Sequence, residues 1–290
     1  TFVVVADYQV IADRDSGGDL AQACLDLVVD HLAAGIDPAR STIFQHSAVP
    51  ELHQLMLPFL SLVTVAELER NPTVKAELAA TGGRAMSGLL LTYPVHQAAD
   101  ILACRGTVVP VGRDQLPHLE TTRLVARRFN ARYGAGTLAE PEALLSETPL
   151  VLGLDGTKMS KSAGNAIALT ATPDEIARAV RGARTDAERT ITYEPERRPY
   201  VANLLRLASF AGAGTPEQVA AQIGGQGAGA LKALLTETLV ESLAPVRERA
   251  ALLRDDRAQV AAVLREGNER ARTEATATLA QVRTAMRMVV

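Results

Sequence analysis

The first half of the chain alternates short apolar runs with longer amphipathic segments, and this alternation constrains the fold more than any other feature. The apolar runs are residues 2–7, 41–45 and 107–112. Each is followed by a segment in which apolar residues recur with helical spacing. Strands that alternate with helices form a parallel sheet covered by helices on both faces. We therefore expect an α/β fold in this half.

The second half has a different pattern. Past about residue 171, apolar residues recur with helical spacing and no convincing strand follows. The helices predicted there are residues 173–180, 201–211, 216–223, 230–243 and 245–288. Those predicted earlier are residues 19–34, 51–63, 85–102 and 115–133. The pattern predicts an α/β domain followed by an all-helical domain.

Length and composition narrow the class of protein. With 290 residues, 47% of them hydrophobic, the chain can form two domains with buried cores. The net charge of −3 excludes a generally basic nucleic-acid coat protein. The two cysteines, Cys24 and Cys104, are too few for a disulfide framework or a zinc site. No apolar run approaches the roughly 20 residues of a membrane span. These features predict a cytoplasmic protein.

The most specific motif is Lys158-Met159-Ser160-Lys161-Ser162, which is preceded by Gly156 and followed by Gly164. Two lysines three residues apart, with small hydroxyl residues between and after them, make a cationic loop. Such a loop can close over a triphosphate and neutralise the charge that develops as pyrophosphate leaves. A solvated basic turn is the alternative interpretation.

This motif matches, letter for letter, the second signature of class I aminoacyl-tRNA synthetases. Residues 88–102 closely resemble the amino-acid-site helix of bacterial tryptophanyl-tRNA synthetases, and residues 109–115 resemble the strand-to-helix turn at the same site. Residues 183–186 and 198–205 are similar to the start of that family's helical domain. The resemblance covers nearly the whole chain in the right order.

The resemblance implies a Rossmann-like ATP- and tryptophan-binding domain over residues 1–168 and a helical domain that binds the tRNA anticodon over residues 169–290. It implies a homodimer that uses ATP with Mg²⁺ to convert L-tryptophan to tryptophanyl-adenylate and then charges tRNA(Trp). No protein nucleophile is needed, because the carboxylate of the amino acid attacks the α-phosphorus. The five histidines show no metal-ligand spacing, so we expect no metal site in the protein itself.

The resemblance also assigns the amino-acid site. Asp100 is expected to accept the indole N–H inside an apolar pocket, and a helix-surface carboxylate is the alternative. Tyr93 and Gln115 are expected to hold the ammonium and carboxylate groups, and Val111 belongs to the same site. Gln9 and Gln97 stand where many relatives carry His and Met, a departure that resembles the divergent second-type bacterial enzymes.

The nucleotide site follows in the same way. Gly112 would let ATP approach the backbone closely, and Asp114 is expected to contact the ribose or to cap a helix. Lys158, Met159, Ser160 and Lys161 would bind the ATP phosphates, with Lys158, Ser160 and Lys161 acting in catalysis. For Lys75, a surface position is favoured over a phosphate contact. From the placement of positive charge in the second half, the candidate anticodon contacts are Arg178, Arg181, Arg184 and Arg206.

The start of the chain and the rival functions complete the expectations. Thr1 leads directly into the first strand without a methionine, so we expect that the chain was cut or incompletely read. The first signature of the family, a His-Ile-Gly-His-like loop, would lie ahead of this strand. Three alternatives stay open: a tyrosyl-tRNA synthetase, a synthetase-like binding or regulatory protein without activation activity, and an inhibitor-resistant duplicate.

Overall fold

The chain forms two compact units. The computed structural model describes residues 1–13, 18–80, 85–145, 151–159 and 164–288. One unit, called here the α/β unit, comprises Thr1–Val28, Asp37–Pro149 and Arg257–Val290. The other, called here the helical unit, comprises Val29–Ile36 and Leu150–Asp256. This division differs from the predicted boundary at residue 168, and the functional division into a catalytic and an anticodon-binding domain stays a prediction.

The strands of the α/β unit are short and parallel. Strand β1 (Phe2–Val5) pairs with β2 (Thr42–Gln45), and β3 (Val108–Pro110) pairs with β4 (Glu142–Leu144). Helix α2 (Leu20–Ala33) lies between β1 and β2 in the sequence. The predicted parallel pairing is confirmed, although the described strands form two separate pairs rather than one sheet.

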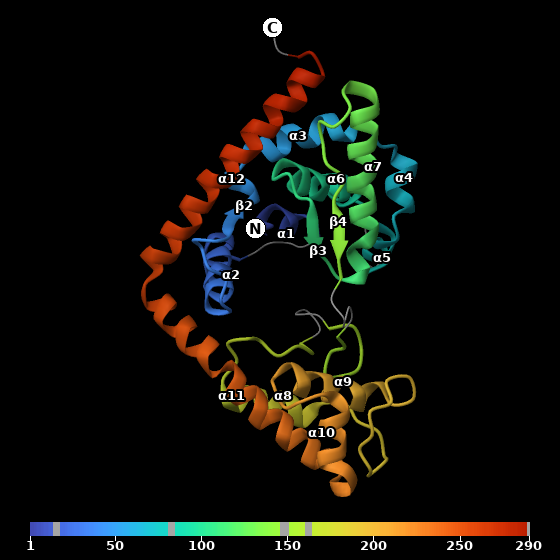
Figure 1. Ribbon diagram of the computed structural model, residues 1–290, viewed down its shortest axis with the longest axis vertical. Helices are drawn as coiled ribbons and strands as arrows, with labels where there is room; N and C mark the ends of the chain where they lie inside the picture. The colour runs from blue at the N-terminus through green and yellow to red at the C-terminus, as the bar shows by residue number, and fades with distance from the viewer. Residues whose placement is uncertain (14–17, 81–84, 146–150, 160–163, 289–290) are drawn as a thin grey trace. The chain divides into compact units, whose positions relative to one another are not determined.

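Helices build most of the α/β unit (Figure 1). They are α1 (Val10–Asp13), α3 (Pro50–Leu60), α4 (Val65–Arg70), α5 (Pro72–Ala80), α6 (Gly88–Ala103), α7 (Leu116–Tyr133) and α12 (Arg257–Ala285), with 3₁₀ turns η1 (Asp7–Gln9), η2 (His46–Ala48) and η3 (Arg113–Gln115). The main core lies where α3, α6, α7 and α12 meet. Leu55, Phe59, Val95 and Phe129 are fully buried there. This core fixes α6, which carries the candidate site.

Helix α12 belongs to the α/β unit, although the sequence placed it in the helical domain. Its Ala271 and Ala275 are part of the main core. A Cβ on Gly267 would lie only 1.8 Å from the carbonyl oxygen of Ile43 in β2, so glycine permits this close backbone approach. Asn268 accepts a 2.9 Å hydrogen bond from the backbone N–H of Gln45. These contacts couple residues more than 200 positions apart, which local periodicity does not reveal.

The helical unit contains α8 (Pro173–Gly182), α9 (Pro199–Phe210), α10 (Pro216–Ile223), the 3₁₀ turn η4 (Gly224–Gln226) and α11 (Ala228–Asp255). Thr172 and Thr215 start α8 and α10 with capping boxes. Helix α11 runs through Pro245 and stops before Asp256, so the predicted break at residue 244 is wrong. The described part of this unit has no strand beyond one bridge between Leu152 and Lys158. The all-helical prediction is confirmed to that extent.

Among the described helices, none is both long enough and apolar enough to cross a membrane.

Candidate active site

Helix α6 places the predicted amino-acid ligands. Ser87 caps its first turn by accepting a 3.0 Å hydrogen bond from the N–H of Leu90. The helix continues past Pro94, so Tyr93 and Asp100 lie two turns apart on one unbroken helix. Both side chains are buried, and Asp100 is 8% exposed. The expectation that Asp100 is a buried carboxylate is therefore confirmed, while its role stays a prediction.

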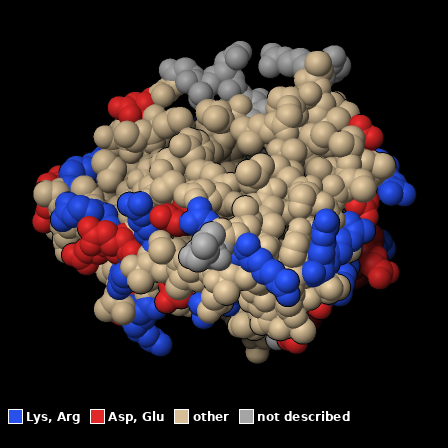
Figure 2. All heavy atoms as spheres, turned by 90° about the horizontal axis from the view of Figure 1, so that it is seen from above, with Lys and Arg blue, Asp and Glu red and all other residues tan. Residues whose placement is uncertain are grey.

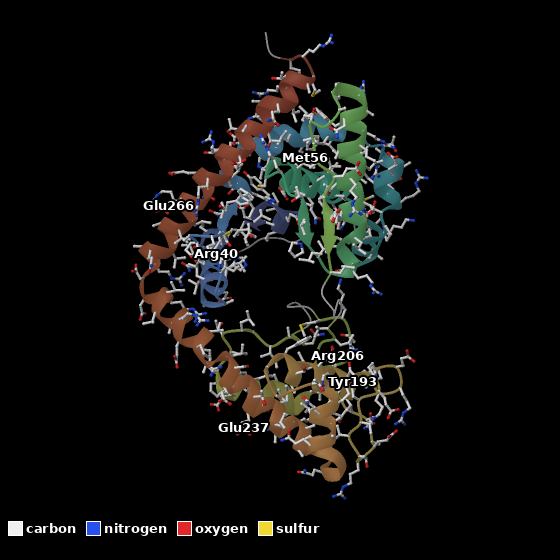
Figure 3. The ribbon with its side chains drawn as sticks, in the orientation of Figure 1. Arg40, Met56, Tyr193, Arg206, Glu237 and Glu266 are labelled. Atoms are coloured by element: carbon white, nitrogen blue, oxygen red, sulfur yellow. The ribbon has the colours of Figure 1, made fainter. Side chains whose placement is uncertain are left out.

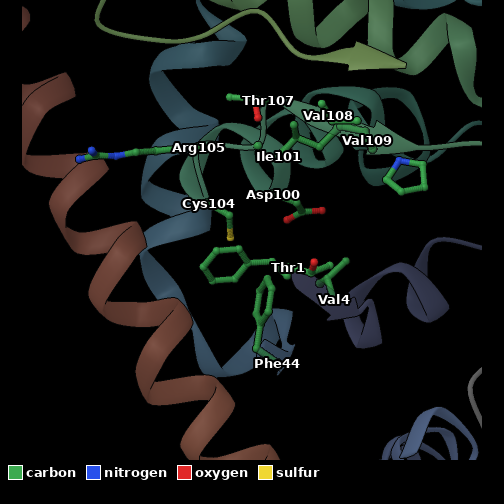
Figure 4. A pocket seen from close by; sticks show the side chains of 13 residues that line it. Thr1, Val4, Phe44, Asp100, Ile101, Cys104, Arg105, Thr107, Val108 and Val109 are labelled. Atoms are coloured by element: carbon green, nitrogen blue, oxygen red, sulfur yellow. The ribbon is translucent and has the colours of Figure 1, made fainter. Parts of the chain in front are cut away.

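Asp100 lines a cavity of about 540 Å³ in the α/β unit. The other walls come from β1, β2, β3 and the end of α6, and their side chains are mostly apolar: Phe2, Val4, Phe44, Ile101, Cys104, Val108 and Val109 are among them. Figure 4 shows the Asp100 carboxylate among these groups. Its Oδ1 is buried and has no hydrogen-bond partner among the described residues. Because an unmade buried hydrogen bond costs about 1–3 kcal/mol, this carboxylate would gain from a ligand that supplies an N–H donor.

Three histidines gather around Asp100. The Nε2 of His46 lies 2.7 Å from Asp100 Oδ2, an ion-pair distance without the alignment of a straight hydrogen bond. The His46 ring stacks on His96 at 4.5 Å, and His53 lies 5.2 Å from His96. Burial is the largest cause that lowers the pKa of His53 and of His96, so both rings are neutral near pH 7. The sequence did not predict this cluster, because its members lie on three elements.

The cluster has the residue types of a metal site. Ligand atoms of His46, His96 and Asp100 lie within 4.8 Å of one another, and two imidazoles with a carboxylate suit zinc or another transition metal. The direct contact between His46 and Asp100 leaves no room for an ion between those two atoms. The geometry therefore favours a direct contact between the two side chains over a shared metal ion. The expected lack of a metal site stays a prediction.

Tyr93, the predicted substrate ligand, contacts α7. A 2.8 Å hydrogen bond joins its hydroxyl to Nε2 of His118. Burial lowers the pKa of His118 to about 4, so this ring is neutral at physiological pH. The neutral pair holds the Tyr93 ring in place at the N-terminal half of α6.

The turn after β3 carries the predicted nucleotide ligands. Gly112 has an extended backbone and starts η3, and Val111 donates its N–H to Leu144 in β4 at 3.1 Å. Asp114 is exposed and lies inside η3. The N-cap of α7 is Gln115, so the capping role considered for Asp114 is wrong. The Gln115 amide donates a 3.3 Å hydrogen bond to Asp114, which brings the two predicted ligands together.

The remaining predicted residues of the α/β unit are placed but not tied to Asp100 by any described hydrogen bond. Gln9 ends η1 and Gln97 lies on α6, and both are half-buried. Lys75 is exposed on α5, which agrees with the favoured surface position.

Residues on both sides of the cationic motif form a tight polar turn in the helical unit. Asn165 is 5% exposed, and its amide donates to Asp155, Thr157 and the carbonyl of Lys158. Hydrogen bonds from the Thr157 backbone and then from Asn165 lower the pKa of Asp155. Gly156 has φ +83°, and a Cβ there would lie 2.1 Å from the Tyr200 ring. The turn therefore fixes the backbone from which the motif starts.

Lys158 is exposed and Met159 half-buried at the end of this turn. Ser160 and Lys161 lie outside the described residues. Asp100 and Lys158 belong to different compact units, so closure of the motif over a nucleotide stays a prediction.

Comparison with known proteins identifies the class of protein. The family model described as class I tRNA synthetases (W and Y) matches residues 1–244, and the chain belongs to this family. Within it, the chain is 39% identical to the tryptophan–tRNA ligase of Streptococcus pyogenes serotype M1, over 98% of this chain and 87% of that relative. The chain is thus similar to tryptophan enzymes across nearly its full length.

Solved structures give the same result. Tryptophanyl-tRNA synthetase from Campylobacter jejuni, complexed with ADP and tryptophan, has a TM-score of 0.81 and 28% identity over 98% of this chain and 88% of its own. The enzyme from Mycoplasma pneumoniae has a TM-score of 0.85 at 28% identity, over 98% and 87%. These matches confirm the predicted Rossmann-like class I fold.

Proposed function

We propose that this protein activates L-tryptophan with ATP and transfers it to tRNA(Trp). The family membership supports the reaction, and the tryptophan–tRNA ligase relatives support the amino acid. The structural observation that carries the choice of tryptophan is the carboxylate of Asp100, which lines a mostly apolar cavity and has one oxygen without a hydrogen-bond partner among the described residues. Indole supplies one N–H donor on a flat apolar body, which suits such a pocket.

The proposed reaction has two steps. In the first, a carboxylate oxygen of tryptophan attacks the α-phosphorus of ATP, and pyrophosphate leaves. In the second, a terminal ribose hydroxyl of the tRNA attacks the carbonyl of the adenylate, and AMP leaves. Asp100 and Tyr93 would orient tryptophan, and Gln115 would hold its polar groups. Lys158, with Ser160 and Lys161, would stabilise the charge on the departing phosphates.

Mg²⁺ is proposed as an ion that arrives with ATP. Magnesium keeps several waters and binds mainly through substrate phosphates rather than through an all-protein cage. No residue of this chain is assigned to it.

The macromolecular partners are also proposals. A tRNA surface is supported by Arg178, Arg181 and Arg184, which are exposed in the helical unit. Arg206 is half-buried and donates a 2.8 Å hydrogen bond to the hydroxyl of Tyr193 (Figure 3). Of the four arginines, it is therefore the least suited to contact tRNA. On the face in Figure 2, basic and acidic side chains are interspersed among the described residues, so tRNA contact would use local groups of arginines. The proposal also includes that the protein forms a homodimer and acts in the cytoplasm.

The decisive experiment is ATP–pyrophosphate exchange with each amino acid in turn, using protein expressed from its complete gene. Exchange that depends on tryptophan, with little on tyrosine, is expected. Exchange with tyrosine alone would show a tyrosyl enzyme instead. No exchange with any amino acid, together with retained binding of tryptophan, would show a binding or regulatory protein.

A further inference from the structure

The two oxygens of Asp100 have different surroundings. Oδ2 lies 2.7 Å from Nε2 of His46, whereas Oδ1 is buried without a partner among the described residues. The orientation of the carboxylate beside the cavity therefore depends on what holds Oδ2 against rotation. The contact with His46 opposes this rotation, because rotation would break it.

His46 is itself held firmly. Its side chain is fully buried, and its ring stacks on His96 with an interplanar angle of 29°. The next residue, Ser47, donates its backbone N–H to Asp7 at 3.1 Å, and its hydroxyl contacts the same carboxylate. The turn η2 is thereby tied to η1, which limits the movement of His46 away from Asp100.

The other groups around the carboxylate are poor substitutes for His46. His53 on α3 and His96 on α6 are neutral near pH 7, because burial lowers the pKa of each. The ring nitrogens of His46 and of His96 all lack hydrogen-bond partners among the described residues, so the short contact with Asp100 is what distinguishes His46. Asp7 and Tyr8 approach from η1, where Asp7 binds Ser47 and the Tyr8 ring lies 5.0 Å from His53. Among these groups, His46 has the 2.7 Å contact with Asp100.

We infer that His46 is a positioning residue for tryptophan recognition: its ring contacts Oδ2 of Asp100 and fixes the orientation of the carboxylate that accepts the indole N–H. The inference rests on the proposed function and adds a residue that the sequence did not single out. His46 does not touch the substrate in this arrangement. Its effect passes through the orientation of Asp100, so it should act on substrates that carry the indole N–H.

The test compares L-tryptophan with 3-benzothienyl-L-alanine, in which sulfur replaces the indole N–H. His46→Phe keeps an aromatic ring against His96 but removes the nitrogen that contacts Asp100. In pyrophosphate exchange, the KM for tryptophan should rise about 10- to 100-fold, because the hydrogen bond from the indole N–H to the charged Asp100 carboxylate is weakened. The kcat should change less than about threefold, and the KM for the sulfur analogue should stay within about twofold of wild type.

Two variants control for general damage to the cluster. His53→Phe changes a histidine of the same cluster that does not contact Asp100, and it should leave the preference for tryptophan over the analogue unchanged. His46→Gln places a polar amide where the ring nitrogen was, next to Asp100, and should recover part of that preference.

The outcomes separate the two proposals. Equal losses for tryptophan and the analogue in His46→Phe would show a merely structural role, and no loss for either would show no role. Both results would overturn the inference while the proposed function stands. Failure of the unaltered protein to activate tryptophan would instead remove the proposed function, and this inference with it.

Discussion

The two compact units differ in how the polar groups of their predicted sites are buried and hydrogen-bonded. In the α/β unit, Asp100 is buried beside a mostly apolar cavity, and one of its oxygens has no partner among the described residues. In the helical unit, residues on both sides of the cationic motif form a network in which Asp155, Thr157 and Asn165 are hydrogen-bonded to one another, while Lys158 is exposed. A buried acceptor left open suits selection of one ligand. A rigid turn that presents a cation suits charge stabilisation. The difference suggests that selectivity and rate can be altered separately.

Substitution of Lys158 should give the largest effect. Lys158→Ala should lower kcat for pyrophosphate exchange about 1000-fold, because a positioned charge that stabilises the transition state is lost. The melting temperature should change little, since the side chain is exposed. Lys75→Ala, which removes an exposed lysine on α5, is the matched control and should change kcat less than about twofold. Equal losses in the two variants would contradict the role of the motif.

Substitution of Asp100 comes next and should act on substrate selection. Asp100→Ala should lower kcat/KM for tryptophan about 300-fold, because the indole N–H loses its buried acceptor. Cys104→Ala, which alters the wall of the same cavity, should cost less than about tenfold. Steady-state exchange kinetics on both variants measure the difference. A loss confined to kcat in Asp100→Ala would break the proposed separation between the units.

The seam between α12 and β2 provides a test of stability in the α/β unit. Gly267→Ala should lower the free energy of unfolding by about 3 kcal/mol, because its Cβ would meet the backbone of Ile43. Gly229→Ala in α11, where a Cβ meets nothing within 4 Å, should be neutral or stabilise by about 1 kcal/mol. Urea denaturation of both variants measures the contrast. Equal stabilities would show that α12 does not pack against β2 at Gly267.

Acid should destabilise the α/β unit through its buried histidines. The pKa of His118 is about 4 in the folded state, below its ordinary value near 6.5. The unfolded state therefore binds more protons between these values, so stability is full above pH 6.5 and falls as pH drops towards 4. The loss from pH 7 to 5 should be at most about 2 kcal/mol. Protection factors of the α6 amides at both pH values, which correct for the intrinsic pH dependence of exchange, measure the loss, and His118→Gln should reduce it. Equal protection factors at pH 7 and pH 5 in the unaltered protein would contradict the buried, neutral state of His118.

The sequence predicted the features that depend on local pattern. The runs that form β1, β2 and β3 could be identified from their apolar residues, and α6 from its period. Strand β4 was missed because Glu142–Leu144 is three residues long and has no β-branched side chain. Chain order also concealed the return of α12 to the α/β unit, since an amphipathic helix does not specify which core it covers.

The candidate site shows the same limit. Asp100 and the cationic motif could be identified because each lies in a continuous string that resembles a known family. His46 could not, because its contact with Asp100 joins η2 to α6 across 54 positions of the sequence. Its position directly after an apolar strand was the only local signal, and single histidines often occupy such positions without a function.

The connection of the helical unit to the rest has a consequence for synthesis. Leu150–Asp256 is inserted in the sequence between two segments of the α/β unit, and α12 leaves the ribosome after every other described element. All residues of the helical unit, including its capping boxes, precede α12 in the sequence and are synthesised first. Until α12 has been synthesised, the surfaces of β2 and α3 that it covers in the folded α/β unit remain exposed. Nascent chains that stall in this interval would expose apolar surface, which makes them natural clients for chaperones.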